Sequence, residues 1–309
     1  MFISIILLVI GFFLLIRGAD AFVDGSAALA RRLHISEFVI GLTVVAMGTS
    51  APEFSVGVAS AIHNATGVAI GNVLGSNIAN ILLILGTLSV ICPLSVRKNT
   101  LYYEMPFIIF ITVLLMWFGW SFGGVTRGAA GLFCILFAIY MLYMFYVPSG
   151  SDTCENTQIK EMSGLKITLN ILLGLGALIL GSDLTVSSAV DIARYLNVSE
   201  RIIGLTIIAV GTSLPELTIS ITAALKHRVD LAIGNIIGSN IFNIVFILGI
   251  IGLINPLPFE PAFIFDSVIA LLAAVLLWMC TLRKSKLTRI HGILFLLLYL
   301  IYLLYLIFA

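Results

Sequence analysis

The chain has 309 residues, of which 61% are hydrophobic and only 10% are charged. Soluble domains carry about 25% charged residues, so this composition excludes a soluble fold and predicts an integral membrane protein. A formal net charge of +1 gives no general attraction to nucleic acid. The four cysteines are scattered without CxxC spacing, so we expect packing thiols rather than a disulfide or a metal site.

Ten apolar segments follow one another along the chain. A membrane span needs about 20 apolar residues, and the segments lack the alternation of membrane β-barrel strands. We therefore expect an all-α membrane protein with ten transmembrane helices. The expected spans are 2–30, 38–62, 68–91, 102–119, 128–147, 166–192, 202–225, 231–254, 262–281 and 290–308.

The two halves of the chain are repeats of each other. "GLTVVAMGTSAPEF" at 41–54 matches "GLTIIAVGTSLPEL" at 204–217, and "GNVLGSNIANILLILG" at 71–86 matches "GNIIGSNIFNIVFILG" at 234–249. Both pairs are offset by 163 residues (204 minus 41, and 234 minus 71). Without a gap, 41–86 and 204–249 share 23 identities in 46 positions.

We expect a first five-helix repeat at 1–147, a polar linker at 148–164 and a second five-helix repeat at 165–309. Because five is odd, the second repeat must enter the membrane from the opposite side. This predicts inverted-topology repeats, an architecture typical of secondary transporters. Odd-numbered loops hold twelve Lys and Arg residues, whereas even-numbered loops hold three. The positive-inside rule then places the linker in the cytoplasm and both termini outside.

The motif "GTSxPE" predicts a break in the second and seventh helices. Pro52 and Pro215 each lack a backbone donor and clash with the carbonyl four residues earlier. Carbonyls freed in this way are tolerated in a membrane only where protein or a water-filled cavity satisfies them. We therefore expect both breaks near the membrane centre, facing inward.

Each break places one carboxylate, Glu53 or Glu216, inside an apolar segment. A charge at the bilayer centre costs at least about 2.5–3.5 kcal/mol. The second, third, seventh and eighth segments contain no Lys or Arg. Bound cations or protons must therefore neutralise the two acids, which we expect to share one site at mid-membrane.

The second motif, "GNxxGSNIxN", supplies further oxygen ligands. Asn72, Ser76 and Asn80 are spaced to share one helix face, and Gly71 and Gly75 are expected to let another helix approach closely. The second repeat carries the same residue types 163 positions later. Oxygen-only ligands favour hard cations such as Ca²⁺ and Na⁺ over softer metals.

The motif pair resembles the two α-repeats of the cation/Ca²⁺ exchanger superfamily, most closely those of prokaryotic sodium/calcium exchangers. The resemblance implies a secondary-active antiporter, not an enzyme, that exchanges Ca²⁺ for Na⁺ by alternating access in a prokaryotic inner membrane. It implies transported ions but no cofactor, with the lipid bilayer and inorganic cations as partners. Separately from the resemblance, a monomer is expected. The ion ligands that it implies are Glu53, Glu216, Asn80, Asn243, Thr49, Ser50, Thr212, Ser213, Ser76 and Ser239, with the carbonyls of Ala46 and Ala209.

Alternatives to this function remain open from the residues. Protons could replace Na⁺ as the counter-ion, or the chain could be a passive cation channel. Asparagine at both central positions, Asn80 and Asn243, disfavours K⁺ coupling, because relatives that move K⁺ carry an aspartate at one of them. Arg17, Asp20 and Asp24 are expected to form an intrahelical or snorkelling pair, with a role beside a gate as the alternative. Four further amides are expected either to bind ions or to hold the broken helices: Asn72, Asn77, Asn235 and Asn240.

Overall fold

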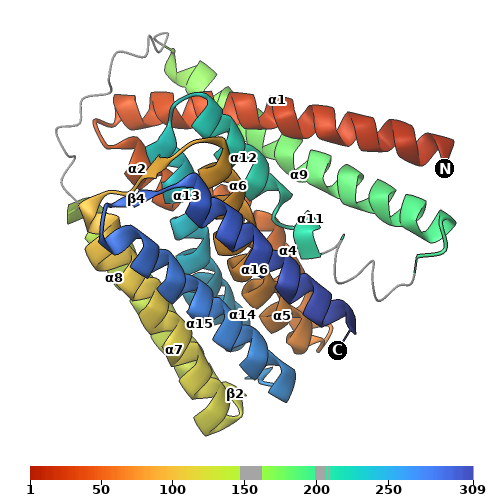
Figure 1. Cartoon of the computed structure of the whole chain (residues 1–309), viewed down its shortest axis with the longest axis vertical. Coiled ribbons are helices and arrows are strands. Elements are labelled where there is room, and N and C mark those ends of the chain that lie inside the picture. The colour runs from red at the N-terminus through yellow and green to blue at the C-terminus, as the bar shows by residue number, and fades with distance from the viewer. Residues whose placement is uncertain (147–161, 199–206, 208, 309) are drawn as a thin grey trace. The chain divides into compact units, whose positions relative to one another are not determined.

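Helices account for nearly all of the structure, a computed structural model that describes residues 1–146, 162–198, 207 and 209–308 (Figure 1). Within these residues, eight helices are long and apolar enough to cross a membrane, and a ninth span is counted if one interrupted pair is taken together. The expectation of an all-helical membrane protein is confirmed. The seventh expected span, 202–225, lies partly outside the described residues, so the count of ten stays a prediction.

The described elements begin and end close to the expected spans. In the first half they are α1 (Phe2–Arg32), α2 (Glu37–Ile40), η1 (Gly41–Val45), α3 (Ala46–Thr49), α4 (Ala51–Ile62), α5 (Thr66–Ile78), η2 (Ala79–Ile84), α6 (Leu85–Ile91), β1 (Leu94–Ser95), η3 (Thr100–Glu104), α7 (Met105–Phe122), β2 (Gly124–Val125) and α8 (Arg127–Tyr146). In the second half they are α9 (Gly164–Tyr195), α11 (Ala209–Gly211), α12 (Leu214–Leu225), α13 (Val229–Ile241), η5 (Phe242–Ile247), α14 (Leu248–Ile254), β3 (Leu257–Pro258), α15 (Pro261–Leu282), β4 (Lys286–Leu287) and α16 (Arg289–Phe308). The η elements are π-helical turns.

Helix ends recur at the repeat offset. α1, α4, α9 and α12 are each followed by a residue with left-handed backbone, namely His34, Asn64, Asn197 and His227, at φ of 56° to 59°. In each case the next N–H bonds a carbonyl five residues back, as Ile35 does to Ala30, which is the Schellman ending. His34 and Asn197, like Asn64 and His227, are 163 residues apart, so the two halves end these helices alike.

Two compact units make up the chain, and each combines segments of both halves. Unit 1 comprises Met1–Thr49, Tyr146–Asn235 and Leu300–Ala309, and unit 2 comprises Ser50–Phe145 and Ile236–Tyr299. Two of the four boundaries fall inside the repeated motifs, between Thr49 and Ser50 and between Asn235 and Ile236.

Unit 1 is built on the long helices α1 and α9, which lie side by side (Figure 1). Glycines line their contact: a Cβ added at Gly18 would lie 2.8 Å from the carbonyl oxygen of Gly174. No side chain other than hydrogen fits at that distance, so the small residues permit the close packing of the two helices.

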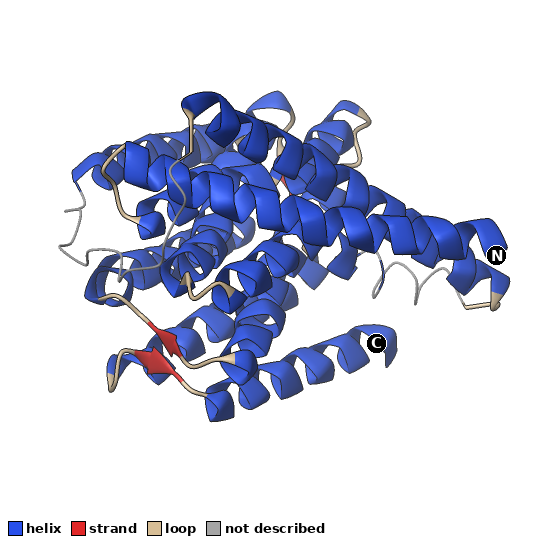
Figure 2. Ribbon diagram, turned by 90° about the horizontal axis from the view of Figure 1, so that it is seen from above, coloured by secondary structure: helices blue, strands red, loops and turns tan. Residues whose placement is uncertain are grey.

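Unit 2 contains α4–α8 and most of α14–α16, and two short strand pairs tie its loops together (strands are red in Figure 2). β1 pairs antiparallel with β4, with Leu94 opposite Leu287. β2 pairs antiparallel with β3, with Val125 opposite Leu257. Two-residue strands are too short to leave a periodic pattern in the sequence, which is why they were not predicted.

Candidate cation site

The first motif interrupts its helix in both halves of the chain. α3 ends at Thr49 and α4 begins at Ala51, with Ser50 between them at φ −82° and ψ 10°. α11 ends at Gly211 and α12 begins at Leu214, with Ser213 at φ −87° and ψ 6°. Both predicted breaks are therefore observed, with nearly the same backbone geometry at the second hydroxyl residue.

Each proline lies at the start of the helix after the break. Pro52 and Pro215 are the second residues of α4 and α12, where a missing N–H removes no intrahelical hydrogen bond. The proline thus begins a new helix instead of bending a continuous one. The same arrangement puts Glu53 and Glu216 in the first helical turn, where the partial positive charge of the helix N-terminus stabilises a carboxylate.

The second motif contains a feature that the sequence did not reveal. Asn80 and Asn243 each lie in a π-helical turn, η2 and η5. The Leu85 N–H bonds the Asn80 carbonyl, and the Leu248 N–H bonds the Asn243 carbonyl, both across five residues. Such turns are frequent at functional sites, but they leave no composition or spacing signal by which sequence reasoning could find them.

In unit 1, a buried amide links the two broken segments. The Thr49 hydroxyl donates to Asn235 Oδ1 at 3.1 Å and to the Ala46 carbonyl at 3.2 Å. Asn235 Nδ2 donates to Ser220 Oγ at 3.0 Å and to the Glu216 carbonyl at 3.5 Å. Thr49, Ser220, Glu216 and Asn235 are each 0% exposed. Asn235 therefore holds α3 and α12 together, one of the two roles expected for it.

In unit 2, the other acid lies against the second motif. The Ser76 hydroxyl donates to Glu53 Oε1 at 3.3 Å, and both residues are buried. This bond brings together two of the predicted ligands, one from α4 and one from α5. The constant spacing of the two motifs in the sequence indicates that they act together, but only the structure shows which of their side chains are in contact.

The central asparagines of unit 2 have spare hydrogen-bonding capacity. Asn243 Nδ2 donates to Asn77 Oδ1 at 3.1 Å, and Asn77 Nδ2 donates to the Asn240 carbonyl at 3.1 Å. Among the described residues, the Asn243 Oδ1 atom and both amide atoms of Asn80 have no hydrogen-bond partner, although each residue is almost fully buried. Buried amides normally have partners, so these oxygens are available to a cation.

The chemistry of the donors fits a hard cation. In the described part of the chain, no group of three or more His, Cys, Asp and Glu side chains could hold a metal ion. The acids instead stand singly beside amides and hydroxyls, which are the oxygen ligands that Ca²⁺ takes.

The predicted ligands divide between the two units, and each unit is described by itself. In unit 1, Ser213 is buried and Thr212 is partly exposed, while Ala209 is the first residue of α11. In unit 2, Ser50 and Ser239 are fully buried. Unit 1 holds Ala46, Thr49, Ala209, Thr212, Ser213 and Glu216, and unit 2 holds Ser50, Glu53, Ser76, Asn80, Ser239 and Asn243.

One packing expectation is wrong for the first repeat. An added Cβ at Gly71 would touch only the Phe263 ring, at 3.6 Å, and at Gly75 it would meet nothing within 4 Å. A Cβ at Gly234 would lie 2.6 Å from the Phe38 carbonyl oxygen and 3.1 Å from Gly41 Cα. The close approach expected of Gly71 and Gly75 is therefore found at Gly234 of the second repeat, because a helix backbone lies against that glycine.

The acids of α1 also have a different partner from the expected one. Lys226 Nζ lies 3.2 Å from an Asp20 carboxylate oxygen and 2.9 Å from one of Asp24. Arg17 lies over the Phe13 ring at 5.5 Å. The expected pairing of Arg17 with Asp20 or Asp24 is therefore wrong: Arg17 lies over a ring of its own helix, and a base 202 residues distant from Asp24 pairs with the acids instead.

The profile of the sodium/calcium exchanger protein family matches the chain over residues 3–146 and 166–308. This match covers most of the chain. The chain belongs to the sodium/calcium exchanger family. The family is one of membrane exchangers rather than enzymes, and this member is accordingly a membrane antiporter for inorganic cations.

Individual relatives agree with this membership. The chain is 40% identical to the putative antiporter CaxA of Alkalimonas amylolytica over 95% of its own length and 94% of that protein's. It is 35% identical to the inner membrane protein YrbG of Escherichia coli (strain K12), over 92% and 90% of the two chains. Among solved structures, the sodium-calcium exchanger NCX_Mj matches with a TM-score of 0.84 and 34% identity, over 98% of each chain.

Proposed function

We propose that this exchanger moves Ca²⁺ in one direction and Na⁺ in the other by alternating access. The observation that carries the proposal is the duplicated set of buried oxygen donors around Glu53 and Glu216. Each acid is fully buried in the first turn of a helix that begins at a break. The resemblance to a sodium-calcium exchanger over nearly the whole chain supports the identity of the two ions.

The proposed ligands are the residues that the two motifs supply in each repeat. Glu53 and Glu216 are the charged ligands, and the amide oxygens of Asn80 and Asn243 complete the cage with hydroxyls and carbonyls. The twelve proposed ligands are Ala46, Thr49, Ser50, Glu53, Ser76, Asn80, Ala209, Thr212, Ser213, Glu216, Ser239 and Asn243. The sequence repeat supports a shared site, because a duplicated motif with inverted topology places its two copies about one axis.

Charge counting limits what the site binds. Two carboxylates carry at most two negative charges, which one Ca²⁺, two Na⁺ or two protons neutralise. Because Asn80 and Asn243 are both neutral, the site has no third acid to hold a K⁺ ion together with Ca²⁺. We therefore propose Na⁺ as the counter-ion, with H⁺ as the alternative.

Membrane orientation follows from the basic residues. We propose ten spans in two inverted five-helix repeats, 1–147 and 165–309, with the linker 148–164 in the cytoplasm and both termini outside. The twelve-to-three distribution of Lys and Arg between odd and even loops supports this orientation.

Radioactive Ca²⁺ uptake into proteoliposomes tests the function. Vesicles are loaded in turn with Na⁺, H⁺ or K⁺. Ca²⁺ uptake is expected only when a Na⁺ gradient is directed out of the vesicles. Glu53→Gln and Glu216→Gln are each expected to reduce uptake by at least about 100-fold, since removing a charged ligand leaves part of the ion's charge unneutralised in a buried site.

A matched acid outside the motifs provides the control. Glu260 is exposed at the start of α15, and Glu260→Gln is expected to leave uptake unchanged. Normal uptake in both motif variants would refute the ion site. Uptake driven by a pH gradient without Na⁺ would identify protons as the counter-ion, and flux without any counter-ion gradient would indicate a channel.

A further inference from the structure

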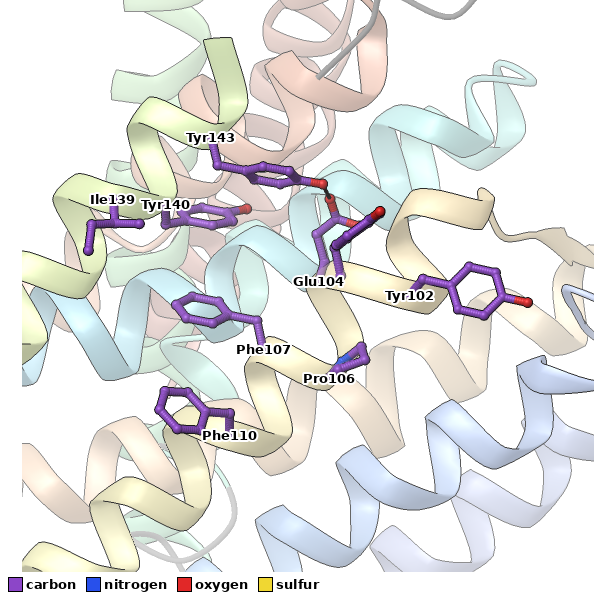
Figure 3. Close-up of a pocket in the computed structure, with 9 residues that line it drawn as sticks. Tyr102, Glu104, Pro106, Phe107, Phe110, Ile139, Tyr140 and Tyr143 are labelled. Carbon is purple, nitrogen blue, oxygen red and sulfur yellow. Dashed lines mark hydrogen bonds between the residues drawn. The ribbon is translucent and has the colours of Figure 1, made fainter. Parts of the chain in front are cut away.

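A cavity of about 450 Å³ lies between η3–α7 and α8, and none of the repeated-motif residues lines it (Figure 3). Its walls are mainly aromatic, and one of its lining residues, Glu104, is an acid. All of the lining residues belong to unit 2. The cavity is therefore a feature separate from the proposed cation site.

Glu104 is an acid that the protein satisfies only in part. It is 1% exposed, and the Tyr143 hydroxyl donates to its Oε1 at 3.0 Å. Figure 3 shows the Glu104 and Tyr143 side chains pointing toward one another from η3 and α8. Among the described residues, Glu104 Oε2 and the hydroxyl of the 6% exposed Tyr140 have no hydrogen-bond partner. Buried polar atoms normally have one, so a donor from outside the chain fits here.

Aromatic rings surround this acid. Tyr140 stacks on Phe107 with ring centroids 5.7 Å apart and an angle of 11° between the planes. Tyr103 and Tyr143 lie with their centroids 6.0 Å apart. Ring faces attract cations, and aromatic cages bind ammonium groups in particular. A carboxylate among rings therefore selects a ligand with an ammonium group and disfavours an anion.

The cavity lies at the end of two consecutive membrane spans. Glu104 is in the first turns of the span Thr100–Phe122, and Tyr143 is in the last turn of the span Arg127–Met144. Two consecutive spans meet the same membrane surface at these ends, which is the depth of lipid headgroups. Tyr102, Tyr103 and Ile139 at the rim are 63%, 60% and 56% exposed, and exposed aromatic residues are typical of that depth.

Similar residue types recur in the second repeat. α8 begins at Arg127 and α16 at Arg289, so these helices are offset by 162 residues (289 minus 127). At this offset, Glu104 corresponds to Asp266, and Tyr140 and Tyr143 correspond to Tyr302 and Tyr305.

We propose that this cavity binds the headgroup of a zwitterionic phospholipid, with the lipid ammonium at Glu104. The rings of Tyr140 and Phe107, which stack on each other, form the wall beside the ammonium, and the apolar wall formed by Phe110 and Ile139 accepts the upper part of an acyl chain. Arg97 and Lys98 lie three and two residues before η3 and offer positive charge to the lipid phosphate.

Native mass spectrometry of the delipidated full-length protein tests this assignment. Phosphatidylethanolamine and phosphatidylglycerol with identical acyl chains are titrated in turn. We expect phosphatidylethanolamine to bind more tightly, and Glu104→Gln to weaken it about tenfold through loss of a charged hydrogen-bond acceptor. Phosphatidylglycerol binding is expected to be the same in both proteins.

Tyr102→Phe is the matched control, because Tyr102 lies at the rim and points away from the Glu104–Tyr143 pair (Figure 3). It is expected to bind both lipids as the wild type does. If Glu104→Gln does not purify as a monodisperse protein, Tyr140→Leu, which removes an aromatic ring and its hydroxyl from the cavity wall, is expected to give the same selective loss.

Three results would overturn the proposal. They are equal binding of the two lipids by the wild type, unchanged phosphatidylethanolamine binding in the monodisperse variant, and displacement of the lipid by equimolar glycerophosphoethanolamine. The last would show that a soluble amine, not a lipid, is the ligand. Normal Ca²⁺ uptake by the variant has no bearing on the assignment, so this test is independent of the proposed transport function.

Discussion

Two buried amides of the repeated motifs, Asn80 and Asn235, have opposite surroundings. Asn235 bonds Thr49, Ser220 and the Glu216 carbonyl. Neither amide atom of Asn80 has a hydrogen-bond partner within the described residues. An amide that is fully bonded in the protein has a structural role, whereas an amide without partners costs stability and is retained only if something else uses it.

Asn235→Ala and Asn80→Ala are therefore expected to separate stability from ion binding. Asn235→Ala removes three hydrogen bonds and is expected to lower the free energy of unfolding by about 1–3 kcal/mol. Asn80→Ala is expected not to lower it, because the amide that it removes is buried without partners and costs stability, but to raise the Ca²⁺ concentration for half-maximal uptake several-fold. Thermal unfolding in detergent and uptake assays measure the two quantities. Equal loss of stability in both variants would show that Asn80, too, is structural.

At the scale of helices, the same motif glycine has a different neighbour in each repeat. The backbone of α2 and η1 lies against Gly234, within 2.6–3.1 Å of an added Cβ, whereas Gly71 faces only the Phe263 ring at 3.6 Å. A backbone cannot move aside as a side chain can, so the two positions differ in the room they leave for a methyl group.

Gly234→Ala is therefore expected to destabilise the protein by about 1–3 kcal/mol through overpacking. Gly71→Ala is its matched control and is expected to be tolerated, since its contact is an ordinary van der Waals distance. The comparison is made by thermal unfolding of the two purified variants. If both unfold at the wild-type temperature, the close helix contact at Gly234 is not rigid.

At the scale of the whole molecule, the proposed orientation makes opposite predictions for two exposed bases. Arg127 is the first residue of α8, at the end of an even loop, and Lys284 follows α15 in an odd loop. In a variant without the native cysteines, we expect Arg127→Cys to react with an impermeant maleimide added outside intact cells. Lys284→Cys is expected to react only after the membrane is opened. The reverse labelling pattern would show that the protein has the opposite orientation in the membrane.

The sequence by itself determined the membrane character, the described spans to within a few residues, and the positions of both helix breaks. These features depend on residues that are close together in the chain. A span is set by a run of apolar side chains, and a break is set by the clash of Pro52 or Pro215 with a carbonyl one turn earlier. The duplicated motifs also gave the family, which the comparisons confirm.

The tertiary structure alone decided which side chains meet. Lys226 pairs with Asp20 and Asp24, and no local rule links a loop to a helix 202 residues away. The π-turns at Asn80 and Asn243 and the acid in the aromatic cavity likewise depend on how helices pack. Packing depends on many weak contacts between distant segments, so the same motif glycine lies against backbone at Gly234 but faces only a side chain at Gly71.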